Sequence, residues 1–184
     1  ATLTIVFSEA VTGFSVDDIS AANAQVADLQ SSDGGITWTA TVTALEGFES
    51  ASNRIRLGTD YTDLAGNRPE AGYSSATYLV DTAGPVFTSA SKVSVAENSG
   101  SGRVVYSAVA EDMSTVSYSL AGVDADLFSI DADSGEVTLN IDPDYETRST
   151  YNIQVIATDA WGNSSVKAVV VQISNHTAGT RVTQ

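Results

Sequence analysis

Oxygen-bearing side chains flank one apolar segment, and they are the first candidates for chemistry. Asp144 and Glu146 precede the run Tyr151–Thr158, and Asp159 and Asn163 follow it. The run has the alternating pattern of a β-strand, so its two ends should lie at opposite ends of a small domain. Calcium prefers about six to eight oxygen ligands from carboxylates, amides and carbonyls. The pattern therefore predicts a partial site for a hard cation at each end of this strand.

The overall charge argues against two classes of partner. The chain of 184 residues carries a formal net charge of -15, which disfavours nucleic acid and anionic lipid. It contains no Cys, which excludes disulfides, Cys-ligated zinc and thiol catalysis. No apolar run approaches the roughly 20 residues of a membrane span. We expect no membrane insertion, and because Ala1 opens directly into a strand-like run, we expect a piece of a longer protein.

Catalytic constellations receive little support from the sequence. His176 is the only His and lies in a polar C-terminal segment, which argues against a Ser-His-Asp triad. Paired carboxylates can serve a glycosidase, but that enzyme needs a cleft. An EF-hand is disfavoured because flanking helices are missing and its final ligand position holds Asp142 instead of Glu. We therefore expect a non-enzyme in which Asp131 and Asp133 make a hairpin turn.

Short alternating segments predict strands throughout and no long helix. In the first half the predicted strands are 2–7, 11–14, 25–29, 36–42, 54–57 and 73–80. In the second half they are 92–96, 103–108, 115–119, 127–130, 136–140, 151–158 and 165–173. Seven short strands in about 85 residues are typical of an immunoglobulin-like sandwich. The predicted fold class is all-β, with two tandem Ig-like β-sandwiches.

The Gly-Pro pair at 84–85 marks the predicted boundary between the halves. Residues 1–84 carry 11 acidic and 3 basic side chains, and residues 85–184 carry 12 and 5, which suits two similar modules. The predicted domains are 1–83, whose first strand we expect to be missing, and 84–175. Residues 176–184 are predicted to be a flexible tail.

The order and direction of the predicted strands indicate at which end of the domain each acidic residue lies. If successive strands reverse direction, the second half has one acidic cluster at each end. The predicted clusters are Glu97, Asp144 and Glu146 at its C-terminal end, and Asp112 and Asp159 at its N-terminal end, beside the linker residue Asp81. Carboxylates that converge in this way repel one another unless they are solvated or bound to a cation.

The same reasoning gives a third candidate in the first half. If Thr2–Phe7 is the second strand of its sandwich, then Glu9, Asp63 and Asn67 gather at the N-terminal end of that half. A plain turn at Asp63–Asn67 is the alternative. Further acids predicted at the opposite end are Asp17, Asp18, Glu46 and Glu49, any of which can extend the cluster at the junction.

The second half resembles a cadherin repeat. The matching motifs are Val-Ala-Glu-Asn (95–98), Val-Ala-Glu-Asp (109–112), Phe-Ser-Ile-Asp-Ala-Asp-Ser-Gly-Glu-Val-Thr-Leu (128–139), Asp-Tyr-Glu (144–146) and Ala-Thr-Asp (157–159). The resemblance implies calcium at the outgoing linker through Glu97, Asp144 and Glu146, and at the incoming one through Asp112 and Asp159. Two departures stand out: Ser114 replaces a family Asp, and Ile173–His176 brings no acid to the outgoing linker.

The first half resembles a bacterial Ig-like repeat of large secreted adhesins. The matching segments are Phe-Ser-Glu-Ala-Val (7–11), Thr-Asp-Leu-Ala-Gly-Asn (62–67) and Val-Asp-Thr-Ala-Gly-Pro (80–85). The combination implies a secreted or cell-surface bacterial adhesin in which Ca²⁺ stiffens tandem repeats and the fragment acts as an extender. Its partners would be neighbouring repeats of the same chain, and a cell-surface glycan or protein.

Two other functions remain open. A carbohydrate-binding module would use exposed aromatic side chains, for which Trp161, Tyr61 and Tyr73 are the candidates, whereas Trp38 is expected in the core. Packing at the junction of the two halves is the other interpretation of Trp161. Homophilic adhesion is a third function and requires the chain to associate with itself.

Overall fold

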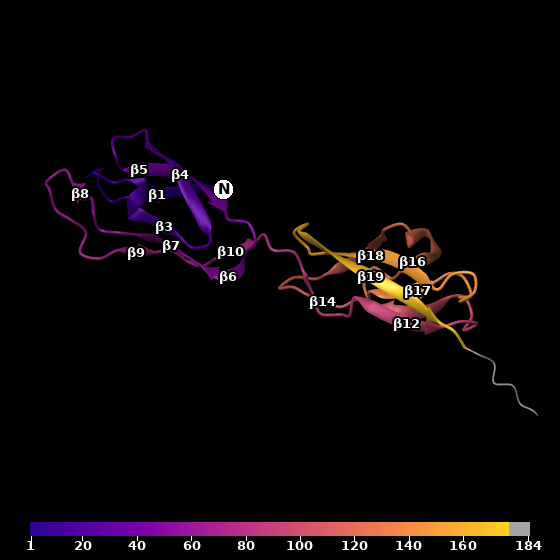
Figure 1. Cartoon of the computed structure of the whole chain (residues 1–184). Helices are drawn as coiled ribbons and strands as arrows, with labels where there is room; N and C mark the ends of the chain where they lie inside the picture. The colour runs from indigo at the N-terminus through magenta and orange to yellow at the C-terminus, as the bar shows by residue number, and fades with distance from the viewer. Residues whose placement is uncertain (177–184) are drawn as a thin grey trace, which may run out of the picture. The chain divides into compact units, whose positions relative to one another are not determined.

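The computed structural model describes residues 1–176 and contains two compact units (Figure 1). The first unit is Ala1–Ala83 and the second begins at Gly84. Within the described residues, regular structure is β-strand apart from the short 3-10 helices η1 (Val16–Asp18) and η2 (Ala125–Leu127). None of the helices in this part of the chain is long and apolar enough to cross a membrane. The fold is all-β, as predicted, and the predicted tail at 176–184 lies outside the described residues except for His176.

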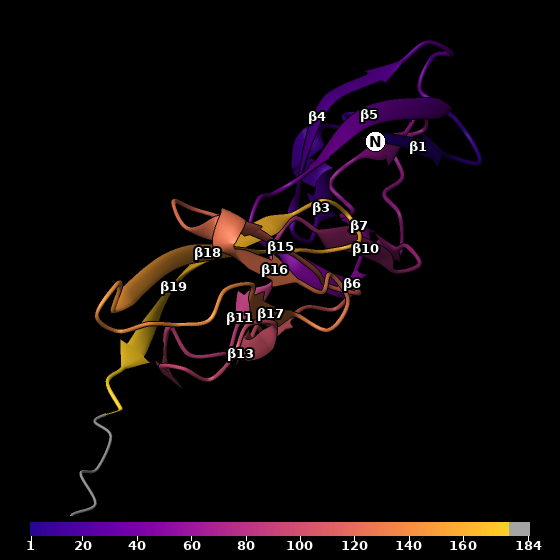
Figure 2. The ribbon, with the colours of Figure 1, turned by 90° about the vertical axis from the view of Figure 1, so that its right-hand side faces the viewer.

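The second unit is a sandwich of two main sheets. One sheet has the order β12-β19-β18-β15 and the other has the order β13-β17-β16, while β11 pairs with β14. The strands are β11 (Val86–Phe87), β12 (Lys92–Ala96), β13 (Arg103–Ser107), β14 (Ala110–Glu111), β15 (Ser117–Ala121), β16 (Phe128–Ile130), β17 (Glu136–Leu139), β18 (Thr150–Thr158) and β19 (Ser164–Ser174). Figure 2 shows the long hairpin of β18 and β19.

Strand directions in the second unit agree with the predicted alternation. β12 runs parallel to β19, and each other neighbouring pair is antiparallel. The core forms because β18 alternates, so that Tyr151, Ile153 and Val155 are buried between the sheets. Leu139 of the opposite sheet is also fully buried. These directions place the loop after β12 and the end of β19 at the same end of the sandwich.

The first unit contains the sheets β1-β5-β4 and β3-β7-β9 with the pairs β10-β6 and β2-β8. The strands are β1 (Thr2–Val6), β2 (Val11–Thr12), β3 (Ile19–Ala21), β4 (Ala24–Ser31), β5 (Thr37–Ala44), β6 (Glu49–Asn53), β7 (Ile55–Leu57), β8 (Thr62–Asp63), β9 (Tyr73–Ser74) and β10 (Tyr78–Asp81). An aromatic group forms part of its core, where Phe14 packs edge-on against Phe7, Trp38 and Tyr61. Trp38 therefore lies against the core, as predicted.

Two segments of the first unit differ from the prediction. Residues 73–80 were predicted as one strand, but β9 and β10 are separate and belong to different sheets. The strand β9 ends before Ser75 because the side-chain hydroxyl of Ser75, and not its backbone, accepts the hydrogen bond from the N–H of Ile55 at 3.0 Å. The segment around Glu49 was predicted as loop, but it forms β6 because it pairs with β10.

The two units share one sheet order. In sheet β1-β5-β4 of the first unit, the strand that comes last in the chain lies between the other two. Sheet β13-β17-β16 of the second unit has the same arrangement, and there β13 is the second main strand of the unit. This correspondence agrees with the interpretation of β1 as a second strand. The missing first strand and the domain limits stay predictions.

Candidate cation sites

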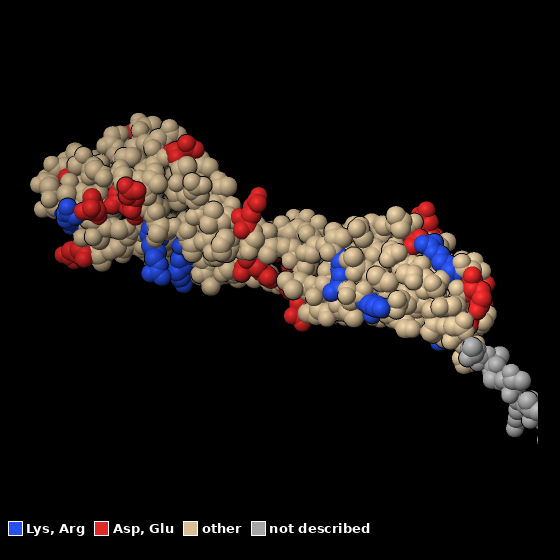
Figure 3. Space-filling view, in the orientation of Figure 1, with Lys and Arg blue, Asp and Glu red and all other residues tan. Residues whose placement is uncertain are grey.

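The cluster predicted at the C-terminal end of the second unit is brought together by the fold. Glu97, Asp144 and Glu146 each offer one carboxylate oxygen within 4.8 Å of the others. Glu97 directly follows β12, whereas the other two lie in the loop between β17 and β18. Figure 3 shows acidic side chains towards the two ends of this unit. The cluster thus joins residues that are far apart in the sequence.

Glu97 is the buried member of this cluster, with 7% of its surface exposed. One carboxylate oxygen accepts a hydrogen bond from the backbone N–H of Tyr145 at 3.2 Å, and the other accepts one from the backbone N–H of His176. Its own N–H donates to the carbonyl oxygen of Ser174. Glu97 therefore links the acidic loop to the end of β19.

Asp144 and Glu146 are exposed and are held by their own loop. Asp144 accepts hydrogen bonds from the hydroxyl of Thr147 at 2.7 Å and from the backbone N–H of Glu146 at 3.0 Å. These bonds, led by the one from the Thr147 side chain, lower the pKa of Asp144 from its ordinary value of 3.8. The side-chain amide of Asn175 donates to Glu146 at 3.0 Å. Both acidic side chains are thereby held by hydrogen bonds at this end of the unit.

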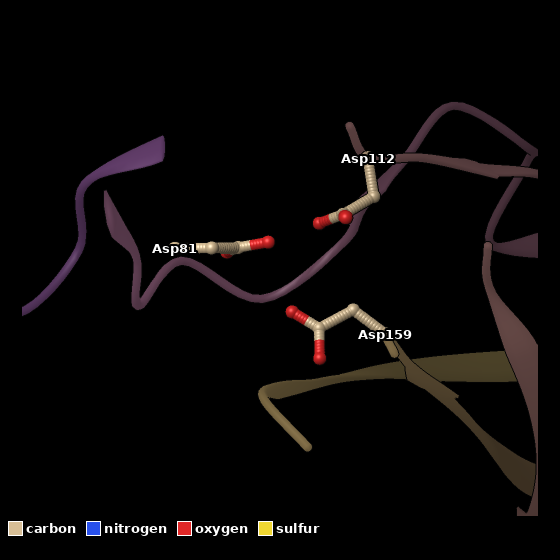
Figure 4. A group of neighbouring side chains, drawn as sticks. All are labelled: Asp81, Asp112 and Asp159. Carbon is tan, nitrogen blue, oxygen red and sulfur yellow. The ribbon is translucent and has the colours of Figure 1, made fainter. Parts of the chain in front are cut away.

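The cluster at the N-terminal end contains Asp112 and Asp159, whose nearest carboxylate oxygens are no more than 4.8 Å apart. Figure 4 shows their side chains converging from two loops. Asp112 follows β14 and Asp159 follows β18. The fold therefore brings these two predicted residues together. Asp81 is the last residue of β10 in the first unit.

Ser114, which departs from the cadherin motif, connects the two loops. Its N–H and hydroxyl donate to one carboxylate oxygen of Asp112 at 2.8 and 2.9 Å. The same hydroxyl accepts a hydrogen bond from the backbone N–H of Ala160, next to Asp159, at 3.1 Å. Ser114 thus fixes the spacing of the two acids without adding a charge.

Asp159 closes a tight turn with Asn163. One of its oxygens accepts hydrogen bonds from the backbone N–H groups of Trp161 and Asn163, both at 2.8 Å, and the other accepts one from the Asn163 side chain at 2.7 Å. Burial raises the pKa of Asp159, but the hydrogen bonds from Asn163, Trp161 and Gly162 outweigh it and bring the pKa below 3.8. The carboxylate is therefore charged at neutral pH.

The first unit contains the same turn. In Asp63–Asn67, the aspartate accepts the backbone N–H of Asn67 at 2.8 Å and its side-chain amide at 2.7 Å, which lowers the pKa of Asp63. Gly66 has a positive φ of 91°, as Gly162 has one of 92° in the second unit. The shared spacing Asp-x-x-Gly-Asn signals the repeat. Glu9, Asp63 and Asn67 line one surface depression, but among residues 1–176 neither acid belongs to a group of three acidic side chains within 4.8 Å of one another.

The remaining candidate residues lie in a turn, in the core or on the exposed surface. Asp131 accepts hydrogen bonds from the backbone N–H groups of Asp133 and Ser134 at 3.1 and 2.8 Å, which is the chemistry of a turn. Tyr61 was a candidate for sugar stacking, but it is buried in the aromatic core of the first unit. Trp161 is 62% exposed, and Tyr73 is also exposed.

An ion pair beside the C-terminal cluster was missed at the sequence level. Asp124, 5% exposed, accepts a hydrogen bond from the guanidinium of Arg148 at 2.6 Å. The two residues lie far apart in the sequence and neither belongs to a motif quoted for the resemblance. Arg148 closes the loop that carries Asp144 and Glu146, because its N–H donates to the carbonyl oxygen of Asp144 at 2.8 Å.

Comparison with known families assigns both units. Residues 1–80 match the family described as bacterial Ig-like domain, and residues 91–174 match the cadherin domain family. The chain is a bacterial Ig-like domain followed by a cadherin domain. Both resemblances noted in the sequence are thereby confirmed. No curated protein shows significant similarity to the chain.

Solved structures of animal cadherins resemble the chain. Human protocadherin-24 EC1-2 is 26% identical with a TM-score of 0.46, and the match covers 49% of this chain and 44% of that one. Cadherin domains 1-4 of protocadherin gamma B7 are 18% identical with a TM-score of 0.50, over 86% of this chain and 41% of that one. Drosophila N-cadherin EC1-3 is 19% identical with a TM-score of 0.49, over 86% and 56%. The chain spans less than two thirds of each protein, and the gamma B7 match supports the sandwich fold.

These families fix the broad class of the protein. Bacterial Ig-like and cadherin domains are typical of adhesion-type surface proteins, where they are extracellular and typically non-catalytic. The cadherin domain carries acidic clusters that can bind Ca²⁺, and their donor set of convergent carboxylates suits that ion.

Proposed function

We propose that the chain is an extender segment of a secreted or cell-surface bacterial adhesin, and that calcium bound at the ends of its domains stiffens the array of repeats. The observation that carries this proposal is the convergence of carboxylates at the C-terminal end of the cadherin domain. Two unit charges at about 4 Å repel by roughly 1 kcal/mol in water and by about 4 kcal/mol at an effective dielectric constant of 20. A bound cation converts this repulsion into attraction.

At the C-terminal end, Glu97, Asp144 and Glu146 are the proposed ligands. The buried position of Glu97 and the turn around Asp144 hold two of the carboxylates in place before any ion binds. Three carboxylates do not complete the six to eight oxygens, roughly, that calcium prefers. We propose that a neighbouring repeat supplies the remaining oxygens.

At the N-terminal end, Asp112 and Asp159 are the proposed ligands, joined by Asp81 from the linker. Gly84, the first residue of the second unit, packs against the start of β19 after the Asp159 turn, because a Cβ at Gly84 would lie 2.8 Å from the backbone of Ser164. Asp81 precedes Gly84 by three residues, which span at most about 11 Å when extended. The short linker supports the proposal that Asp81 acts as a third ligand at this end of the cadherin domain.

For the first domain we propose a further calcium site at Glu9, Asp63 and Asn67. The support is the Asp63–Asn67 turn, which repeats the hydrogen bonds of Asp159–Asn163. Glu9 follows β1, as Asp112 follows the β13–β14 region, so the two domains share an arrangement. This site would also need ligands from a neighbouring repeat.

A titration followed by NMR tests the proposal residue by residue. The amide N–H of Tyr145 donates to Glu97 and that of Trp161 donates to Asp159, so these two signals report the two clusters. Calcium is expected to shift both signals with saturation, and magnesium only weakly. If neither signal moves at millimolar calcium, the proposed sites do not exist.

Carbohydrate binding is the alternative function, and the exposure of Trp161 is the observation that favours it. Tyr73 adds a second exposed ring in the first domain. A glycan array separates the two functions: retention of a sugar by the intact chain and its loss in Trp161→Ala would support the alternative. An extender with no sugar site gives the same blank array for both proteins.

A further inference from the structure

We propose that Arg148 and Asp124 are positioning residues, which hold the loop of Asp144 and Glu146 in the geometry that captures calcium. This inference rests on the proposed function, because it concerns affinity for calcium at the C-terminal cluster. Neither side chain is among the proposed ligands. Their effect passes through the backbone of the loop between β17 and β18.

Arg148 has contacts in several directions. Its backbone N–H closes the acidic loop on the carbonyl oxygen of Asp144 at 2.8 Å. Its guanidinium donates to Asp124 at 2.6 Å and to the carbonyl oxygen of Thr150 at 3.0 Å. The guanidinium also lies 4.7 Å from the ring centre of Tyr151, which is 2% exposed. The side chain therefore fixes the end of the loop to the core.

Asp124 supplies the fixed end of this link. Its second carboxylate oxygen accepts the backbone N–H of Asn152 in β18 at 2.7 Å. Its backbone begins η2, and its carbonyl oxygen accepts the N–H of Leu127 at 3.0 Å. A carboxylate buried to this extent needs a charged partner. The pair with Arg148 is thus a rigid connection between the sheet and the acidic loop.

The loop is anchored at its other end as well. The carbonyl oxygen of Pro143, a fully buried residue, accepts the N–H of Asn98 at 2.8 Å, and Asn98 follows the ligand Glu97. Asp144 and Glu146 lie between this anchor and Arg148. Loss of the Arg148 anchor would release only one end of the loop, so the domain can stay folded while the carboxylates spread.

The sign of the effect separates positioning from simple electrostatics. Removing a positive charge near a cation site strengthens cation binding if charge alone matters. Removing a residue that orients metal ligands weakens binding, typically by about 10- to 100-fold. Arg148→Met is therefore expected to weaken calcium binding, although it makes the chain more negative.

The test is an NMR calcium titration of the whole chain carrying Arg148→Met, Asp124→Asn or the control Arg103→Met. Arg103 is exposed and donates to the carbonyl oxygen of Ser99 at the same end of the domain, so its replacement gives the same charge change without touching the loop. The amide signals of Tyr145 and Trp161 give one affinity for each cluster. Urea unfolding of each variant measures the separate effect on stability.

We expect Arg148→Met and Asp124→Asn to weaken calcium binding about tenfold at Tyr145 and to leave the affinity at Trp161 unchanged. Arg103→Met is expected to bind as tightly as the wild type or slightly more so. Wild-type affinity at Tyr145 in Arg148→Met overturns the positioning role, as does an equal loss at both signals. If Asp124→Asn does not fold, Arg148→Lys decides: it keeps the charge, loses the bond to Thr150, and should fall between wild type and Arg148→Met. Absence of calcium binding in the wild type instead refutes the proposed function.

Discussion

Replacing Asp159 by Asn tests whether its charge serves calcium or only its turn. The variant keeps the size of the side chain and an oxygen for the backbone N–H groups of Trp161 and Asn163. It loses the charged acceptor of the Asn163 amide. Asp131→Asn is the matched control, because Asp131 also accepts two backbone N–H groups in a turn but belongs to neither cluster.

Without calcium, two effects of Asp159→Asn oppose each other. A hydrogen bond to a charged group contributes about 1.5–3 kcal/mol, and the substitution removes one. The substitution also removes repulsion from Asp112, which is no more than 4.8 Å away. That repulsion is roughly 1–4 kcal/mol, depending on the local dielectric constant. We therefore expect the variant to melt close to the wild type in EDTA.

With calcium, the variant should be less stable than the wild type. At a calcium concentration of about 100 times Kd, binding stabilises the folded wild type by about 2.7 kcal/mol. A tenfold weaker site would contribute only about 1.4 kcal/mol under the same conditions. For a domain of this size 1 kcal/mol shifts Tm by roughly 4–8 °C, so the variant should melt about 5–10 °C below the wild type.

Differential scanning calorimetry with EDTA and with calcium measures both conditions. Asp131→Asn is expected to lower Tm by the same amount in each, because it weakens a turn that does not take part in calcium binding. The reasoning is refuted if Asp159→Asn keeps the full calcium-induced rise in Tm. It is refuted equally if Asp131→Asn loses as much of that rise.

Three further predictions follow from single features. Without calcium, the contribution of Asp144 and Asp159 to folding stability should be complete above pH 3.8 and should be lost as the pH drops through their lower folded-state pKa values. Acid denaturation of Asp144→Asn and Asp159→Asn beside the wild type would measure this contribution. An Ala in the left-handed backbone conformation costs roughly 1–2 kcal/mol. In urea unfolding, Gly100→Ala should lower the free energy of unfolding of the domain by that amount, and Gly135→Ala should lower it by more because its Cβ would lie 2.5 Å from a backbone oxygen. Ser114→Asp should tighten calcium binding at the N-terminal cluster roughly tenfold by adding a carboxylate, and a calorimetric titration that shows weaker binding would contradict this.

The cadherin domain was predictable because its strands are regular. The run around Ile153 alternates over its whole length, so its buried face and its ends follow from the sequence. Once directions alternate, Glu97 must lie at the same end as Asp144, although many residues separate them. The fold brings them together for the same reason, since β12 and β19 run parallel.

Features formed by pairing between distant segments were not predictable. Strand β6 forms because residues near Glu49 pair with β10, and no local sequence pattern predicts that pairing. The pair of Asp124 and Arg148 likewise depends on how η2 packs beside β18. Tyr61 was misplaced because an aromatic residue in a loop can turn inward, as this one does to meet Phe14.

The most direct test of the account is a calcium titration of the whole chain, with heat of binding, Tm and small-angle X-ray scattering measured on the same samples. The account predicts saturable binding, a higher Tm and a narrower distribution of interdomain distances as calcium rises, all reversed by EDTA. Binding without any change in scattering would contradict the stiffening role. The absence of both heat and a change in Tm would contradict the calcium sites themselves.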